Sequence, residues 1–198
     1  MVIGRTTLVG PAGRTLTAMS VAVARTGPMT IEELWELPDD GRRHELVDGV
    51  LVVTPSPGAA HQDAVAQLHL LLAPALPPDL KVMLSPFDWV AGPASVFEPD
   101  LLVARRDDIG PLRLEHPPVL AVEVLSPSTR HVDRGLKRSA YASAGVAHYW
   151  LVDPTVPSLT VLRLAGDAYV EMAVLQGDEA LVVAEPFAVT VVPSALRD

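Results

Sequence analysis

Residues 119–154 read VLAVEVLSPSTRHVDRGLKRSAYASAGVAHYWLVDP, and this stretch contains the pattern that decides the fold. Residues 119–125 predict a buried strand, residues 132–144 a helix that ends at Gly145, and residues 147–153 a second strand. A strand, a helix and a strand joined in this way form a βαβ unit, in which the strands are parallel and adjacent. We therefore expect an α/β protein with a mixed central β-sheet flanked by helices.

The flanking segments add further elements to this unit. Thr30 and Glu33 form a capping box that predicts a helix over residues 30–37. The Asp48–Gly49 pair predicts a hairpin turn within residues 44–53. Residues 91–95 are expected to form a turn. A second helix is expected over residues 61–73, and strands over residues 81–90 (interrupted at Pro86), 99–104 and, as a C-terminal β meander, 159–164, 169–174 and 181–183.

The composition describes one ordinary folded domain. A chain of 198 residues with 49% hydrophobic content can bury a real core. We expect a single domain over residues 29–198, preceded by a flexible extension over residues 1–28 that lacks the apolar core of a signal peptide.

Charge and residue usage exclude several classes of function. The chain has no cysteine, so disulfides, thiolate zinc sites and cysteine nucleophiles are ruled out, and a cytoplasmic location is expected. No apolar run approaches the ~20 residues that a membrane span needs. The net charge of -9 means that any contact with nucleic acid must use a local basic patch.

Glu123 stands inside the apolar strand, on the same face as Ala121 and Leu125. A buried carboxylate needs a cation or a proton, because leaving it unpaired costs several kcal/mol. One solution is a divalent metal with Asp100, at the start of another strand, as its second ligand; Mg²⁺ suits a site of one or two carboxylates. The alternative is a structural ion pair between Glu123 and Arg130 or Arg134.

The following helix supplies an amine. Asp133, Lys137 and Tyr141 are spaced four residues apart and share one face. If this face covers the end of the Glu123 strand, Lys137 reaches the metal and can polarise a water or neutralise charge in a transition state. The alternatives are a solvated Lys137 paired with Asp133, and a Tyr141 that only fills the core.

These motifs resemble the Uma-two family of restriction endonucleases, within the PD-(D/E)XK nuclease superfamily. The resemblance covers roughly residues 29–192 and rests on Pro99-Asp100, on Glu123-Val-Leu-Ser-Pro-Ser-Thr, on Asp133-Arg-Gly-Leu-Lys137 and on Tyr149-Trp-Leu-Val-Asp-Pro. It implies a restriction-endonuclease-like fold with Asp100 and Glu123 as metal-binding acids. The superfamily places its lysine two residues after the glutamate, where this chain has Leu125, so that Lys137 would replace it from the helix.

The resemblance also implies roles outside this block. Glu45 would be a further acid near the metal, and His61 a pocket residue at a helix N-terminus, although a packing role for His61 is the plainer interpretation. The expected activity is a Mg²⁺- or Mn²⁺-dependent endonuclease acting on DNA, with no membrane partner and, by analogy with double-strand cutters, as a homodimer.

The basic segment at residues 130–138 is the candidate phosphate-contacting patch, with Arg130, Arg134 and Arg138, although a solvated helix face explains it equally well. Two other functions remain open. One is a nuclease-fold module without catalysis, which binds protein or nucleic acid. The other is a serine hydrolase built on Ser126 or Ser128, which lacks the Gly-x-Ser-x-Gly turn.

Overall fold

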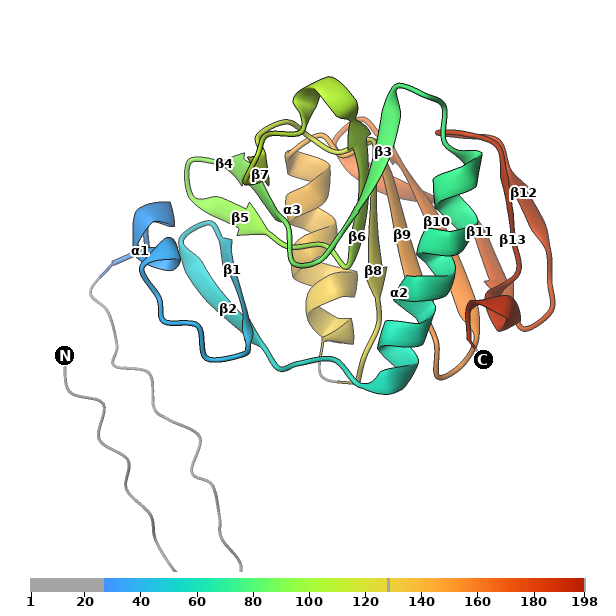
Figure 1. The fold of residues 1–198 in the computed structure, drawn as a ribbon, viewed down its shortest axis with the longest axis horizontal. Coiled ribbons are helices and arrows are strands. Elements are labelled where there is room, and N and C mark those ends of the chain that lie inside the picture. Colours follow the sequence, from blue (N-terminus) through green and yellow to red (C-terminus); the bar gives the residue numbers. More distant parts are fainter. Residues whose placement is uncertain (1–26, 128, 198) are drawn as a thin grey trace, which may run out of the picture.

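A mixed six-stranded sheet is the centre of the molecule. A computed structural model describes residues 27–127 and 129–197, so that all but the last two residues of the expected N-terminal extension lie outside the described residues. The sheet has the order β11-β10-β9-β8-β6-β3 (Figure 1). Its strands are β3 (Leu80–Leu84), β6 (Leu101–Arg105), β8 (Leu120–Val124), β9 (His148–Asp153), β10 (Ser158–Ala165) and β11 (Ala168–Gln176). β8 and β9 are parallel, which confirms the βαβ prediction, and the other neighbours are antiparallel.

A second, five-stranded sheet has the order β2-β1-β5-β4-β7. It consists of β1 (Arg43–Val47), β2 (Val50–Thr54), β4 (Asp88–Gly92), β5 (Ser95–Phe97) and β7 (Arg113–Leu114). The strand predicted over residues 81–90 is therefore two strands in different sheets, divided near Pro86. The turn predicted over residues 91–95 is shorter than expected, because β4 continues to Gly92 and β5 begins at Ser95.

The helices follow the predicted caps. Thr30 caps α1 (Ile31–Trp35), and the reciprocal bonds of the capping box with Glu33 are both present. The remaining elements are α2 (Ala59–Leu72), η1 (Ala73–Ala75), η2 (Arg106–Asp108), η3 (Val132–Lys137), α3 (Arg138–Ser143), β12 (Leu181–Val183), β13 (Val189–Val191) and η4 (Pro193–Leu196). Within the described ranges, every helix is too short or too polar to cross a membrane.

The helix predicted over residues 132–144 is continuous, but its two parts have different helical geometry. Its first part, η3, is a π-helix, and α3 continues it as an ordinary α-helix. Gly145 ends it with a φ of 81°, in the left-handed region that glycine adopts without strain. Single π-helical turns inside helices are often found at functional sites.

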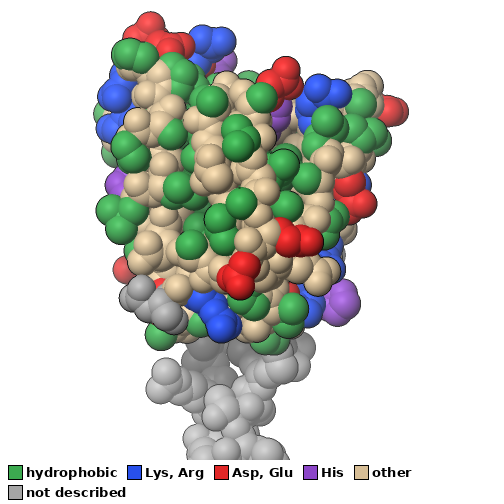
Figure 2. Space-filling view, turned by 90° about the vertical axis from the view of Figure 1, so that its right-hand side faces the viewer, with side chains coloured by type: hydrophobic (Ala, Val, Ile, Leu, Met, Phe, Trp, Pro, Cys, Tyr) green, Lys and Arg blue, Asp and Glu red, His purple; other side chains and the backbone are tan. Residues whose placement is uncertain are grey.

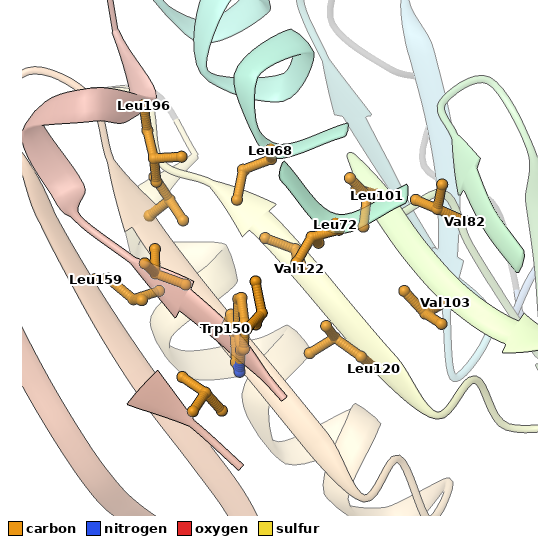
Figure 3. Packing of buried hydrophobic residues seen from close by; sticks show 14 of the residues in the cluster. Leu68, Leu72, Val82, Leu101, Val103, Leu120, Val122, Trp150, Leu159 and Leu196 are labelled. Carbon is orange, nitrogen blue, oxygen red and sulfur yellow. The ribbon is translucent and has the colours of Figure 1, made fainter. Parts of the chain in front are cut away.

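The central sheet is covered on both faces, and β8 shows how the sequence divides them. Leu120, Val122 and Val124 face α2 in one core, where Leu68 and Leu72 lie near Val122 and Trp150 (Figure 3). Ala121 and Leu125 belong to the other core, beneath α3 and the five-stranded sheet. Glu123 therefore points toward α3, as its position in the strand predicts.

The surface near the C-terminal strands is mostly apolar and neutral at its centre. Figure 2 shows this side, with scattered hydrophobic side chains and with most of the charged ones toward the margins. Exposed apolar residues on these strands are Val170, Met172, Val174 and Val182. The charged groups of interest lie instead in a pocket between the two sheets.

Candidate functional site

Asp100, Glu123 and Lys137 meet in one pocket of about 220 Å³, whose wall also includes residues 54–58. Asp100 directly precedes β6, which pairs with β8. The backbone N–H of Val124 donates to Asp100 Oδ2 over 2.8 Å, and this bond holds the aspartate beside the neighbour of Glu123. The structure thus brings together the three residues that the sequence singled out.

Lys137 lies at the buried floor of this pocket. Its Nζ is 2.9 Å from Glu123 Oε1, 2.9 Å from Glu45 Oε2 and 3.7 Å from Asp133 Oδ1. Burial opposes the charge of this amine, but the carboxylates of Glu123 and Glu45 raise the pKa of Lys137 above its usual value. Lys137 is therefore a buried cation held by acids from two sheets, and the alternative of a solvated helix lysine is wrong.

Glu123 is buried, and its Oε1 has a second donor. The Tyr141 hydroxyl donates to Oε1 over 2.6 Å, next to the Lys137 ammonium. Burial raises the pKa of Glu123 well above its usual value, against the opposing charge of Lys137. The alternative pairing with Arg130 or Arg134 is not formed, since Arg130 lies 3.2 Å from Asp153 and Arg134 is exposed.

Asp100 carries more hydrogen bonds than its neighbours. Arg43 donates to Oδ1 over 2.8 Å, and His61 Nε2 lies 3.0 Å from Oδ2, which also accepts from Val124. Burial alone would raise the pKa of Asp100, but the bond with His61 and the charge of Arg43 lower it. These donors favour the ionised form of Asp100, and His61 contacts it from the first turn of α2.

Glu45 connects the second sheet to the pocket floor. It is 1% exposed, although a glutamate on a short hairpin strand is usually solvated. Its Oε1 accepts from the backbone N–H of Glu98 over 2.9 Å, while Oε2 meets Lys137. The structure thus brings Glu45 to the lysine that also contacts Glu123, while its role as a further acid near the metal stays a prediction.

Three residues of this network were not expected from the sequence. Arg43 lies 3.0 Å from Glu98 and also donates to Ser85 Oγ over 3.0 Å, and Ser85 in turn donates to Glu98 over 2.7 Å. A signal was present, because Arg43 and Glu45 share a face of β1. Ser85 and Glu98 are distant in sequence and only the packing of the two sheets reveals them.

The predicted phosphate patch lies outside the pocket. Arg130 is paired with Asp153, and Arg138 donates to the Tyr169 carbonyl over 3.1 Å. Arg134 is exposed. Since none of these arginines lines the pocket, the structure does not bring them together with the acids, and their contact with phosphate stays a prediction.

The donors in the pocket fit a hard divalent cation. Five acidic side chains gather against the permanent cations Arg43 and Lys137, so that negative charge is in excess: Glu45, Glu98, Asp100, Glu123 and Asp133. Burial raises the pKa values of Glu98 and Asp133, as expected where like charges crowd. A bound cation would relieve this excess.

The free lone pairs limit how many ligands the protein can offer. The two oxygens of a carboxylate have about four lone-pair sites, and Arg43, His61 and Val124 use three at Asp100. At Glu123 both side-chain donors meet Oε1. In the described part of the chain no group of three or more His, Asp or Glu is arranged as a metal cluster. Two carboxylates with water completing the shell is a coordination that suits Mg²⁺.

The fold places the chain among proteins of restriction-endonuclease-like fold. A crystal structure of a "putative nuclease belonging to DUF820" from Anabaena variabilis matches with a TM-score of 0.71 over 85% of this chain and 97% of that one, at 19% identity. The chain belongs to the Uma2 family, described as "Putative restriction endonuclease", whose family model matches residues 31–194. No curated protein matches the chain.

Proposed function

We propose that this protein is a Mg²⁺- or Mn²⁺-dependent endonuclease that hydrolyses phosphodiester bonds, with DNA as its substrate. The observation that carries the proposal is the position of the Lys137 ammonium, 2.9 Å from Glu123 in a pocket that also contains Asp100. Two acids that can hold a divalent ion, with one ammonium beside them, can together stabilise the charge that develops on a phosphate during hydrolysis.

Each side chain has a defined task in this proposal. Asp100 and Glu123 would hold the divalent ion. When bound, this ion would act as a Lewis acid that stabilises the negative charge developing on the phosphate. Lys137 stays protonated, because its neighbours raise its pKa. It therefore donates hydrogen bonds and orients a water or a phosphate oxygen, rather than removing a proton. Glu45 holds Lys137 from the other side.

The test compares cleavage of supercoiled plasmid by the wild-type protein, Asp100→Asn and Glu123→Gln with Mg²⁺ or Mn²⁺. Loss of a metal ligand removes several kcal/mol of transition-state stabilisation, so that each variant should lose at least about 100-fold in rate. Chelation of the metal should abolish wild-type cleavage.

Glu171→Gln is the matched control, because Glu171 is an exposed acid on β11. This variant should cleave like the wild type. Full activity of Asp100→Asn or Glu123→Gln would overturn the assignment of the site.

One observation favours a second candidate, a nuclease-fold module that binds without catalysis. Protein donors already contact both acids, with Arg43 and His61 at Asp100 and with Lys137 and Tyr141 at Glu123. Titration calorimetry with Mn²⁺ separates the two functions. A protein that binds no metal and cleaves no nucleic acid, yet retains DNA or RNA in a filter assay, would be the module.

A further inference from the structure

Within the part of the chain that the structure describes, Tyr141 is the tyrosine whose hydroxyl donates to an ionisable side chain. The chain has three tyrosines, and the hydroxyls of Tyr149 and Tyr169 donate to the backbone carbonyls of Asp133 and Val146, over 2.9 and 2.7 Å. Tyr141 instead donates to Glu123 Oε1 over 2.6 Å. That length is typical of a charge-assisted bond between a hydroxyl and a carboxylate.

This bond and the Lys137 bond end on the same oxygen. Lys137 and Tyr141 are one turn apart on the helix, and both donors meet Oε1. The carboxylate is thus anchored through one oxygen, and Oε2 is left for a ligand in the pocket. A metal ligand whose orientation is fixed by hydrogen bonds binds more tightly than one that must first be ordered.

The Tyr141 ring is itself held in place by aromatic neighbours. Its centroid lies 5.3 Å from Trp89, 4.9 Å from Phe97 and 5.1 Å from Tyr149, each in an edge-on arrangement. Trp89 and Phe97 come from the five-stranded sheet and Tyr149 from the central one. Packing against three rings holds the Tyr141 ring beside Glu123, so that its hydroxyl is a preorganised donor.

We propose that Tyr141 is a positioning residue of the metal site, which fixes Glu123 Oε1 together with Lys137 and so presents Oε2 to the divalent ion. This inference rests on the proposed function, because it assumes that Glu123 binds the metal. The hydroxyl of Tyr141, and not only its aromatic ring, then determines the affinity for the metal.

The experiment measures Mn²⁺ binding by titration calorimetry, and the melting temperature, for the wild type, Tyr141→Phe and Tyr149→Phe. Both substitutions remove one buried hydroxyl from the same aromatic cluster and keep the ring. Tyr141→Phe should weaken Mn²⁺ binding at least about tenfold. Tyr149→Phe should lower the melting temperature to a similar extent while it binds Mn²⁺ like the wild type.

The two proposals fail in different ways. Wild-type protein that binds no Mn²⁺ would overturn the metal-dependent function and this inference with it. A wild type and a Tyr141→Phe variant of equal affinity would overturn the role of Tyr141 alone, and so would equal weakening in both variants, since that indicates a purely structural effect.

A second measurement covers the case in which Tyr141→Phe does not fold. Wild-type protein labelled with 3-fluorotyrosine gives three ¹⁹F signals, which Tyr149→Phe and Tyr169→Phe assign by elimination. Diamagnetic Mg²⁺ should shift the Tyr141 signal in a saturable way and leave the Tyr169 signal in place. An unmoved Tyr141 signal at saturating Mg²⁺ would refute the proposal.

Discussion

Lys137 is the residue on which the charge balance of the pocket depends. It is one of only two lysines in the chain, and it lies within 2.9 Å of both Glu45 and Glu123. Removing one partner of a buried ion pair is costly because the other charge stays buried without compensation. The role of Lys137 in stability can therefore be measured separately from any role in catalysis.

We expect Lys137→Met to lower the free energy of unfolding by about 3–5 kcal/mol at pH 7.5. Burial already raises the pKa of Glu123, and loss of the ammonium raises it further. The folded state then binds more protons than the unfolded state, so stability rises as the pH falls through the folded pKa. Urea unfolding at pH 7.5 and 5.5 should show a smaller deficit at the lower pH.

Lys81→Met is the control for this experiment, because Lys81 is exposed on β3. Its unfolding free energy should stay within about 0.5 kcal/mol of the wild type at both pH values. A Lys137→Met deficit that is the same at both pH values would contradict the coupling to buried acids.

At the level of elements, the β1–β2 hairpin brings Arg43 into the pocket wall and Glu45 against Lys137. Its turn consists of Asp48 and Gly49, with φ values of 49° and 79°. A Cβ on Gly49 would lie 2.4 Å from Pro28 Cβ. Gly49 thus satisfies two demands at once, a left-handed backbone and a close approach of the preceding segment.

Gly49→Ala should destabilise the protein by more than Gly41→Ala. Gly41 also has a positive φ, of 72°, but an added Cβ there meets no atom within 4 Å. Strain in the left-handed region costs about 1–2 kcal/mol, and only Gly49 adds a steric clash to it. Thermal and urea unfolding of the two variants measure the difference, and equal losses would refute the importance of the contact with Pro28.

The sequence predicts the helix ends and the turn that depend only on residues close together in the chain. The capping box at Thr30, the turn at Asp48–Gly49 and the end of the helix at Gly145 are all confirmed. The division of residues 81–90 between two sheets was missed, because it depends on pairing with β6 and β5 rather than on the segment itself. The π-helix was missed because i, i+4 spacing does not distinguish it from an α-helix.

The residues of the site also fall into two groups, those that the sequence indicates and those that only the packing of the sheets reveals. Glu123 was found because a carboxylate in an apolar strand demands a partner, and Asp100 and Lys137 followed from their places beside that strand. Arg43 was missed although it shares a face of β1 with Glu45, and Ser85 and Glu98 were missed because they follow strands that are far from β1 in sequence. Their network exists only where the two sheets meet.

For the whole molecule, the two sheets share one buried layer around α3, and we expect them to unfold together. Trp89 is buried in the five-stranded sheet and Trp150 in the central one, while Trp35 is more exposed. Variants that keep only Trp89 or only Trp150, with phenylalanine at the other two positions, report on each sheet separately.

In urea, the fluorescence of each single-tryptophan variant should change at the same denaturant concentration as its circular dichroism. Coincident transitions are the signature of the single domain predicted over residues 29–198. Separate midpoints for the two signals within one variant would show that the sheets are independent folding units.

The contact of Glu45 with Lys137 has a consequence for how this molecule tolerates change. An acidic side chain of one sheet neutralises an amine on the helix that covers the other sheet. If the two layers slid by the length of one side chain, these two charges would be separated in a place that water cannot reach. We therefore expect insertions to be accepted best at the outer edges of the molecule, and substitutions to be accepted least where the two layers meet.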